Sequence, residues 1–424
     1  MPDMANPELP LPDGLVLRPF RGVRYAVDDL ASVTSPPYDL ITPDDTTRLL
    51  AESPDNVVRV ILPERSQRGY EQARDTLRHW LASGVLVPDA LPALYVYEQS
   101  GLGFLQRGLI GDVALADPAQ MIILPHEDVL PGLVADRLAL MRTTQANLEP
   151  IFLLYDGGGP ASQLVDEVAT VRFPLIDIRS HDGIRHRLWA VTEPAEIDAV
   201  AADMHDRQAL IADGHHRYAT YRVFQRENHE AGSGDGPWDF GLALLVDSTL
   251  YPPDLKVIHR VIPGLSLTDA VTRAKGACQV HEYTNLEDAL TGLAAAPDPA
   301  FVLAGEGDHA HLLTEPDPLQ VEHAMPDDHS QQWKSLSTAV LTMFLLPRVW
   351  GLEDNEGSVL IVHHDPLAAV ALARRHGGTA VLLKPPSADD IFAIAARGER
   401  VPRKSTSFGP KPRTGLVMRT LFNG

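Results

Sequence analysis

Apolar residues recur along this chain with two different periods, and these periods predict alternating strands and helices. In residues 151–247, short apolar runs alternate with segments in which apolar positions return every three to four residues. Such alternation is typical of an α/β layer with a mixed or parallel sheet. The expected strands are 151–155, 173–178, 187–192, 209–212 and 240–247, and the expected helices are 161–171, 194–204 and 215–229.

The same two patterns continue on both sides of this region. Before it, strands are expected at 15–17, 57–62, 93–99, 105–116 and from Ile122, and helices from Thr42, over 70–83 and near 134–147. After it, the helices are expected at 286–294, 335–350, 366–376 and 388–397, and the strands at 301–303, 311–314, 359–362 and 380–383.

These elements divide the chain into four parts. Residues 1–14 contain four prolines and are expected to form a disordered tail. Residues 15–262 are expected to form an α/β core, and residues 263–400 an appended α/β subdomain. Residues 401–424 carry a basic stretch, and the apolar pattern that resumes at Val417 indicates that this stretch returns to the core.

A strand-to-helix turn after residue 212 is the most informative local pattern. The small apolar strand 209–212 is followed by Asp213, Gly214, His215, His216 and Arg217, which open a helix. Free N–H groups and the positive dipole end at a helix start favour a phosphate or carboxylate, and a glycine lets such a ligand approach the backbone. Arg217 adds a two-pronged donor, and the histidines can donate, accept or bind metal. The alternative is structural, with Asp213 serving only as the helix N-cap.

Two further groups of polar residues stand on loops or at helix starts. His126 and Glu127 follow the strand from Ile122, and Asp136 and Arg137 lie on the next helix. A histidine, two carboxylates and an arginine so close together suit acid–base chemistry, although a solvated loop with a surface ion pair has the same pattern. Asp39 sits on a proline-rich loop before the helix that begins near Thr42, where it is either a carboxylate at a pocket rim or a turn residue.

The most basic segment of the chain lies near its carboxyl end. Five cations fall between residues 400 and 413, interleaved with hydroxyl groups. Lys404, Ser405, Thr406 and Lys411 are therefore candidates to complete a phosphate pocket, against the alternative of a solvated basic tail.

Composition narrows the possible classes of protein. The formal net charge of −21 argues against a broad nucleic-acid footprint, which needs clustered Lys and Arg. A single cysteine, Cys278, excludes an internal disulfide and a multi-cysteine metal site. No apolar run is long enough to cross a bilayer and the first residues lack a signal-peptide pattern, so a cytoplasmic location is expected. Neither a phosphate loop nor a dinucleotide-binding glycine motif occurs.

The turn also carries a family resemblance. Residues 212–218 resemble the signature of the bacterial and archaeal family of domains of unknown function numbered 1015. Other stretches fit its pattern in order, over about residues 15–418: Arg18–Gly22, Ser35–Asp39, Pro125–Glu127, Ala135–Leu138, Ala146–Phe152, Lys404–Thr406 and Pro410–Lys411. The turn is similar as well to the nucleotide-binding turn of the ParB and sulfiredoxin-like superfamily, which includes free serine kinases, CTP-hydrolysing partition proteins and sulfiredoxins.

This resemblance implies a ParB/sulfiredoxin-like nucleotide-binding core within a mixed α/β fold. It favours a kinase that transfers a phosphoryl group from ADP or ATP to a small hydroxylated substrate such as free serine, with Mg²⁺ as cofactor. Sulfiredoxin chemistry needs a cysteine in the turn, where this chain has His215 and His216. The acidic charge weakens the analogy to DNA partition. The oligomeric state is not indicated.

The residues expected to act in such a kinase form three groups. The candidates for the base or metal ligand are Glu127, Asp213 and Asp39. The candidates for binding phosphate are Gly214, His215, His216, Arg217, Lys404, Ser405, Thr406 and Lys411. The candidates for binding substrate are His126, Asp136, Arg137 and Asn147. Two other functions remain open. One is a non-catalytic nucleotide or amino-acid sensor with the same pocket. The other, less favoured because no helical His-x-x-x-His spacing occurs, is a metal-dependent hydrolase using His126, Glu127, His215 and His216.

Overall fold

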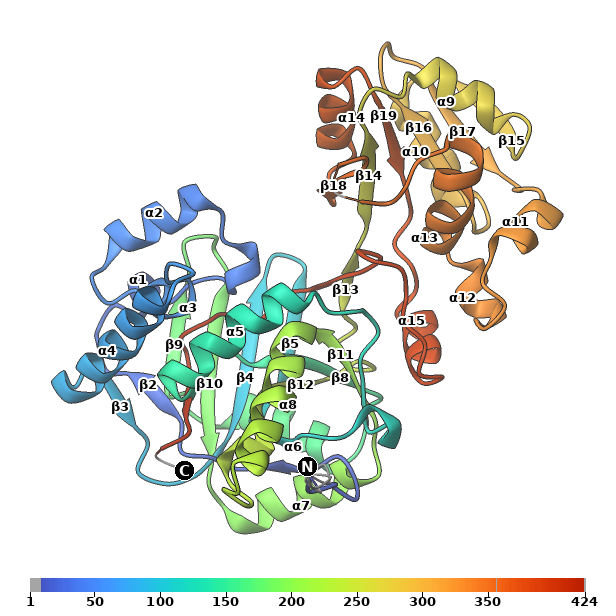
Figure 1. Ribbon diagram of the computed structural model, residues 1–424. Coiled ribbons are helices and arrows are strands. Elements are labelled where there is room, and N and C mark those ends of the chain that lie inside the picture. Colours follow the sequence, from blue (N-terminus) through green and yellow to red (C-terminus); the bar gives the residue numbers. More distant parts are fainter. Residues whose placement is uncertain (1–8, 356, 423–424) are drawn as a thin grey trace, which may run out of the picture. The chain divides into compact units, whose positions relative to one another are not determined.

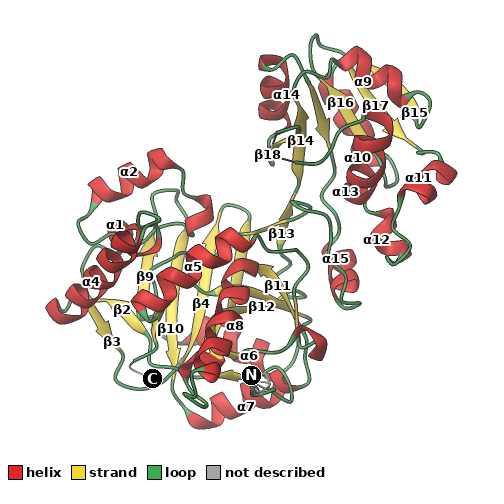
Figure 2. Cartoon of the chain, in the orientation of Figure 1, coloured by secondary structure: helices red, strands yellow, loops and turns green. Residues whose placement is uncertain are grey.

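The chain forms two compact units in the computed structural model, which describes residues 9–355 and 357–422. The first unit comprises Met1–Pro252 and Pro410–Gly424, and the second comprises Pro253–Gly409. Figures 1 and 2 show that both units combine helices with sheets. The mixed α/β fold class is therefore confirmed.

A nine-stranded mixed sheet forms the centre of the first unit. Its strand order is β6-β11-β8-β12-β5-β4-β10-β9, and β1 pairs with β5 at one side. β11 runs parallel to β6 and antiparallel to β8, and β8 runs parallel to β12; the other pairs are antiparallel. The strands are β1 (Leu17–Arg18), β4 (Leu94–Gly101), β5 (Phe104–Ala114), β6 (Ile123–Leu124), β8 (Ile151–Tyr155), β9 (Ile176–Arg179), β10 (Arg185–Val191), β11 (Ala209–Asp213) and β12 (Phe240–Asp247).

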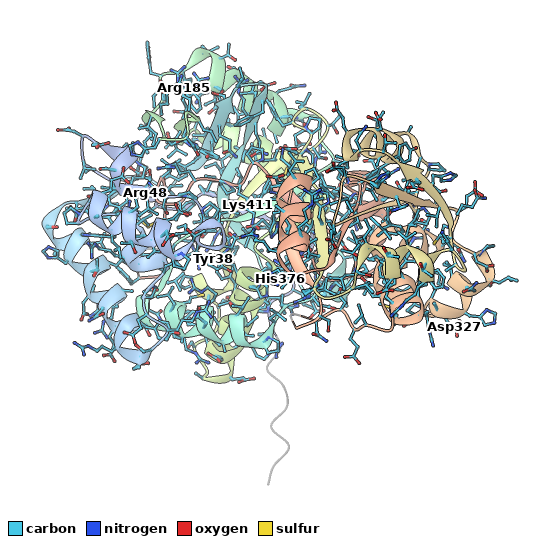
Figure 3. The ribbon with its side chains drawn as sticks, turned by 90° about the horizontal axis from the view of Figure 1, so that it is seen from above. Tyr38, Arg48, Arg185, Asp327, His376 and Lys411 are labelled. Carbon is cyan, nitrogen blue, oxygen red and sulfur yellow. The ribbon has the colours of Figure 1, made fainter. Side chains whose placement is uncertain are left out.

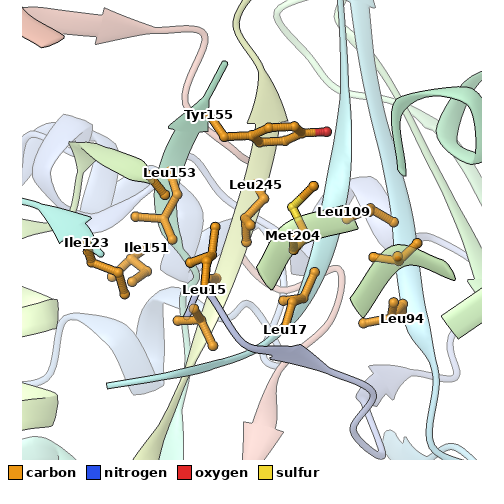
Figure 4. Close-up of a cluster of buried hydrophobic side chains, with 14 of the residues drawn as sticks. Leu15, Leu17, Leu94, Leu109, Ile123, Ile151, Leu153, Tyr155, Met204 and Leu245 are labelled. Atoms are coloured by element: carbon orange, nitrogen blue, oxygen red, sulfur yellow. The ribbon is translucent and has the colours of Figure 1, made fainter. Parts of the chain in front are cut away.

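Helices cover this sheet because its central strands are apolar on both faces. All five residues of β8 are buried, as are seven of the eight in β12. α8 (His215–Glu230) packs on β8 and β12 and lies beside α5 (Pro131–Thr144), as Figure 1 shows. α6 (Pro160–Val171) packs on β4 and β5 and against α7 (Pro194–His205). Figure 4 shows part of the resulting core, in which Leu15, Leu153 and Met204 meet Leu245.

A second apolar cluster in the first unit is built from helices. Trp80, Leu77 and Tyr25 are buried in it. The elements around it are β2 (Val23–Tyr25), α1 (Leu30–Val33), η1 (Tyr38–Leu40), α2 (Pro43–Glu52), α3 (Val58–Ile61), α4 (Gln67–Ser83) and β3 (Leu86–Pro88). The prediction of a strand at 57–62 is wrong, because this β-branched segment forms α3, whose Val58, Val60 and Ile61 are buried. Tertiary burial outweighs β-propensity there.

The second unit has a six-stranded antiparallel sheet of order β15-β17-β16-β19-β14-β18. Its core joins this sheet to α10 (Leu286–Ala295) and α14 (Pro366–Arg375). The strands are β14 (Ile258–Ile262), β15 (Gln279–Tyr283), β16 (Phe301–Ala304), β17 (Ala310–Thr314), β18 (Leu360–His363) and β19 (Thr379–Leu382). The other elements are β13 (Asp254–Lys256), α9 (Leu267–Ala274), α11 (Pro318–Ala324), α12 (Gln331–Ser335), α13 (Ser337–Val340), the π-helix η4 (Leu341–Trp350), α15 (Ala388–Ala395) and β20 (Ser407–Gly409).

The compact units divide at other positions than the sequence interpretation placed them. β14 was assigned to the core, but it pairs with β18 and β19 of the second unit. The basic carboxyl-terminal stretch is divided at Gly409–Pro410. Residues 1–8 of the expected tail lie outside the described residues, while residues 9–14 form neither helix nor strand and are anchored by a bond from Gln120 Nε2 to the Pro12 carbonyl (2.7 Å).

Within the described residues, every helix is too short or too polar to span a membrane.

Candidate functional site

The turn between β11 and α8 is held by a glycine in the left-handed region. Gly214 has φ = 95° and occupies the N-cap position, so Asp213 is the last residue of β11 rather than the N-cap that the sequence suggested. A Cβ at position 214 would lie 3.0 Å from Ile151 Cγ2 and 3.1 Å from Arg217 Nε. The glycine is therefore required both by its backbone conformation and by the close packing around it.

Asp213 lies between two cations. Its Oδ2 accepts from Arg217 Nη2 at 2.5 Å, and its Oδ1 is 2.5 Å from Lys411 Nζ. Lys411 also forms an ion pair with Asp39, so one ammonium bridges carboxylates from two distant elements. Burial would lower the pKa of Lys411, but the Asp213 and Asp39 carboxylates more than offset it and the pKa is raised. Asp39, Asp213, Arg217 and Lys411 are thus brought together in the first unit, where Figure 3 labels Lys411.

The Arg217 guanidinium is buried and its contacts are to the protein. Nη1 donates to the Pro150 carbonyl at 2.6 Å, and the group lies over the Tyr38 ring at 5.9 Å. Burial would lower its pKa, yet the nearby Asp213 and Glu149 carboxylates raise it overall. Arg217 therefore supplies positive charge behind the turn and fixes the Asp213 carboxylate, as well as the start of β8 through Pro150.

Glu149 is a member of this cluster that the sequence interpretation missed. It is buried, and its Oε1 accepts from the Tyr38 N–H (3.0 Å) and the Thr414 hydroxyl (2.9 Å). Burial raises its pKa, against the opposing effect of Arg217. Glu149 lies within residues 146–152, one of the stretches that fit the family pattern, and this was the only indication of a role in the sequence. A single glutamate before a proline forms no motif that would indicate a site.

The loop after β6 is tied to the start of α8 by two histidines. The backbone N–H of His126 donates to His215 Nε2 at 3.3 Å, and that of Leu130 donates to His216 Nε2 at 3.0 Å. The ring of His126 meets that of His215 edge-on, with centroids 4.5 Å apart. Because an accepting nitrogen carries no proton, both α8 histidines are unprotonated at Nε2. They attach the loop to the turn.

The parallel pairing of β6 with β11 brings Glu127 and Asp213 to the same edge of the sheet. β6 and β11 are parallel neighbours with Leu124 opposite Leu210, and Glu127 and Asp213 each lie three residues further on. Carboxyl ends of parallel strands meet at one edge of a sheet, so the two carboxylates leave the sheet at the same edge. Glu127 is half-buried there.

Asp136, Arg137 and Asn147 are in the same unit but are turned inward. Arg137 donates to Asp136 Oδ2 (2.6 Å from Nη2) and to the Ile61 carbonyl (2.7 Å). Asn147 Oδ1 accepts from Arg419 Nη1 at 3.0 Å. Arg137, Asn147, Glu149 and Arg217 line a cavity of about 40 Å³, which admits water-sized molecules but no amino acid.

The remaining predicted phosphate ligands belong to the second unit. The Ser405 hydroxyl donates to the Pro402 carbonyl (2.6 Å) and lies 3.0 Å from Thr338 Oγ1. Lys404 has φ = 56°, and its carbonyl accepts from Arg260 Nη2 at 2.9 Å. Thr406 is buried and precedes β20. Lys404, Ser405 and Thr406 therefore belong to a different compact unit from Lys411.

One group of three possible metal ligands occurs within the described residues, and it lies away from the turn. His229, Asp235 and Asp239 place their ligand atoms within 4.8 Å of one another. His229 is fourteen residues after His215 on α8, which is about 21 Å along a helix. The Asp39 and Asp213 pair therefore remains the acidic group at the turn itself.

The chain belongs to a family. The family model described as "Protein of unknown function (DUF1015)" matches residues 17–339, three quarters of the sequence. This confirms the resemblance drawn from the turn and its accompanying motifs. No curated protein matches the sequence.

Solved structures show remote similarities. SbnI with a C-terminal truncation, from Staphylococcus aureus, is 12% identical with a TM-score of 0.38, and the match covers 73% of this chain and 87% of that one. A mutant free serine kinase in complex with ADP is 13% identical with a TM-score of 0.35, covering 71% and 87%. A conserved hypothetical protein from Pyrococcus furiosus is 14% identical with a TM-score of 0.35, covering 75% and 97%. The function proposed below therefore rests on the geometry of the turn.

Proposed function

We propose that this protein is a small-molecule kinase that transfers a phosphoryl group from ADP or ATP to a hydroxylated substrate, with free serine as the first candidate. The observation that carries the proposal is the convergence at the β11–α8 turn of a glycine-supported helix start, the buried Arg217 and Lys411, and the carboxylates Asp213 and Asp39. Phosphoryl transfer needs positive charge around the phosphates and a carboxylate at the attacking hydroxyl.

The helix start and the two cations supply the phosphate-binding part. The N–H groups that open α8 favour an anion. His215 and His216 stand at the same helix start, and we assign them to the phosphate as well, because a histidine ring can donate to an anion. Lys411, whose ammonium already lies at the turn, is the cation that can turn toward it.

Among the three carboxylates, we assign the base to Glu127. Both oxygens of Asp213 face cations, Arg217 on one side and Lys411 on the other, which leaves it without an oxygen for a substrate hydroxyl. Asp39 is held by Lys411 through Oδ2. Glu127 stands on the loop that follows β6, and the parallel pairing of β6 with β11 brings this loop and Asp213 to the same edge of the sheet.

The residues at the turn also fit Mg²⁺. This ion takes one or two carboxylates together with substrate phosphates, and Asp39 and Asp213 already converge on a single cation, the Lys411 ammonium. When bound, Mg²⁺ would neutralise charge on the phosphates. Asp39 and Asp213 are the residues that would hold it, and Lys411 would have to give way.

The decisive experiment is phosphoryl transfer by a Glu127→Gln variant. With ADP or ATP as donor and a panel of hydroxylated amino acids as acceptors, we expect the rate to fall by about 10²- to 10⁴-fold, while nucleotide affinity stays near that of the wild type. Asp128→Asn is the matched control, because Asp128 is the adjacent, exposed carboxylate and should retain full turnover.

The same assay separates a sensor from a kinase. A sensor is favoured by one observation, the complete engagement of Asp213 by cations. If the wild type binds nucleotide but transfers phosphate to no acceptor, the sensor replaces the kinase. If Glu127→Gln keeps full turnover, the base has to be sought at Asp39.

A further inference from the structure

The amino-terminal Arg-Pro-Phe-Arg-Gly segment, which the proposed kinase does not use, lines a separate cleft in the first unit. The cleft has a volume of about 740 Å³. Arg18–Arg21 form one wall, the end of β5 and the segment 235–240 form others, and Arg419 and Thr420 close it. Small-molecule sites commonly occupy some 300–1,000 Å³ and are largely apolar, with a few convergent polar groups.

The apolar part of the cleft is formed by rings and branched side chains. Phe20 and Leu115 are buried, and Pro19, Pro92 and Phe240 complete the surface. The Arg18 guanidinium stacks over the Phe240 ring at 3.2 Å from its centroid. These side chains offer an apolar surface for the body of a ligand. The Phe240 ring covers one face of the Arg18 guanidinium, so the N–H groups at the edge of the guanidinium point away from the ring.

Arg18 is the more loosely held of the two arginines that face Asp112 in this cleft. The buried Asp112 carboxylate is already neutralised by Arg419, whose Nε lies 2.7 Å from Asp112 Oδ1. Arg18 Nη2 is 3.6 Å from Asp112 Oδ2, which is too long for a hydrogen bond. The Arg18 side chain is 43% exposed, so its donors can reach an incoming acceptor.

Thr420 provides an independent sign that the cleft is built for a ligand. The residue is 4% exposed and lines the cleft, and its Oγ1 has no hydrogen-bond partner within the described part of the chain. An unpartnered buried hydroxyl costs free energy, and native structures generally provide a partner for such a group. A polar atom of a ligand in the cleft would be that partner.

We propose that this cleft binds a small monocarboxylate with an apolar body. Its carboxylate would pair with the two-pronged edge of Arg18, its apolar part would lie against Phe20 and Leu115, and Thr420 would hydrogen-bond to it. A doubly charged phosphate is disfavoured, because three aspartates, Asp112, Asp235 and Asp239, also line the cleft and balance its three arginines. The site is distinct from the β11–α8 turn and does not depend on the proposed kinase activity.

Benzoate is the probe that tests this proposal, with benzyl alcohol and benzylamine as matched compounds of different charge. Calorimetric titration of the full chain, without nucleotide, should show saturable binding of benzoate and about tenfold weaker binding, or none, of the other two. Arg18→Gln should weaken benzoate binding by about tenfold or more. Arg21→Gln is the control, because it removes a neighbouring charge at the rim while its Nε donates only to the Asp89 carbonyl.

A second variant locates the site even if Arg18→Gln is poorly folded. Pro92 is exposed at the cleft, so Pro92→Trp should fill the space without disturbing the core and should abolish benzoate binding. The proposal is overturned if benzyl alcohol binds as tightly as benzoate, if folded Arg18→Gln binds like the wild type, if Pro92→Trp leaves binding unchanged, or if benzoate shows no saturable binding.

Discussion

Lys411 is the cation that pairs with both aspartates of the candidate site. Its ammonium bridges Asp39 and Asp213, which are 174 positions apart in the sequence, and its side chain is only 12% exposed. Removal of this cation would leave two neighbouring carboxylates facing each other. Like charges at such a distance repel, and a divalent metal ion relieves that repulsion.

We therefore predict that Lys411→Met binds divalent metal more tightly than the wild type does. The two carboxylates lose their resident cation, so the affinity for Mn²⁺ should rise by about tenfold or more, which corresponds to at least about 1.4 kcal/mol. Electron paramagnetic resonance of free Mn²⁺, without nucleotide, measures this directly.

Lys404→Met is the control for that experiment, because it removes the same charge from the other part of the basic segment, which belongs to the second unit. Equal Mn²⁺ affinity in Lys411→Met and the wild type would mean that Asp39 and Asp213 do not form a cation site.

At the residue scale, the sequence indicated the location of residues that stand at a recognisable structural position, such as a turn between a strand and a helix. Gly214 and Arg217 stand at the strand-to-helix turn that the sequence predicted, and the binding of an anion there stays a prediction. The pairing of Asp39 with Lys411 had no local signal, because it arises from the return of residues 410–422 to the first unit. The inward orientation of Arg137 could not be predicted from the sequence either. The side chain donates to the Ile61 carbonyl, and the sequence around Arg137 does not show that this distant carbonyl lies within reach.

At the element scale, the β11–α8 connection depends on a single backbone conformation. Gly214 at φ = 95° starts the helix directly after the strand, without a longer loop. This places Asp213, Arg217 and the first N–H groups of α8 within one turn of each other. Ile151 and Arg217 lie so close to the glycine that the turn leaves little space for a side chain there.

Gly214→Ala should therefore be more damaging than a glycine substitution at the other end of the same helix. Both Gly214 and Gly232 have positive φ, but a Cβ at 232 meets nothing within 4 Å, whereas one at 214 meets Ile151 and Arg217. We expect Gly232→Ala to cost about 1 kcal/mol of unfolding free energy and Gly214→Ala about 1–3 kcal/mol more. Urea denaturation measures both, and equal losses would contradict a packing role for Gly214.

Most strands and helices were predictable, because their periodicity agrees with their burial. The strands at 151–155 and 240–247 have the predicted bounds, and the helix at 70–83 ends at Gly84, which has φ = 79°. The helical structure of segment 57–62 was not predictable. Its β-branched residues favour a strand, and the local sequence does not show that the surrounding helices bury them. The π-helical form of 341–350 had no sequence signal either.

Strands β4 and β10 hold a buried histidine whose protonation should affect stability. His186 lies between the Tyr97 hydroxyl (2.8 Å to Nδ1) and Ser180 Oγ (3.1 Å to Nε2), and burial, together with the Arg413 charge, lowers its pKa from 6.5 to about 3. Between these values the unfolded chain binds a proton that the native state does not. Stability is thus fully present above pH 6.5 and falls as the pH drops, by about 1.4 kcal/mol per unit from this group.

His186→Gln should remove that dependence. Between about pH 7 and pH 5, the unfolding free energy of the wild type should fall by about 2 kcal/mol more than that of the variant. His79→Gln, on an exposed face of α4, serves as the control and should behave like the wild type. Parallel losses in the wild type and His186→Gln would show that the native state protonates this histidine freely.

At the scale of the whole molecule, the first unit is completed by the carboxyl-terminal segment of the chain. The described residues 410–422 return to it after the second unit has been completed. Their side chains enter its interior: Arg419 neutralises the buried Asp112, Thr414 donates to Glu149, and Arg413 donates to Thr34. The backbone of Arg419–Thr420 pairs with Ala146–Asn147. The sequence indicated this return through the apolar pattern that resumes at Val417, but not the depth of the contacts.

Truncation of the chain after Gly409 should consequently destabilise the first unit itself. Asp112 would lose its close cationic partner, and breaking such a buried pair costs about 3–5 kcal/mol, a large part of the stability of an ordinary domain. Truncation after Leu421 is the matched control, because Arg419 and Thr420 remain and the removed Phe422 is exposed. Hydrogen exchange of amides in β5 and β8 should become fast in the first truncation and stay slow in the second. Slow exchange in both would mean that residues 410–421 rest on a unit that is stable without them, and the loss of Lys411 and Thr414 would then affect ligand binding alone.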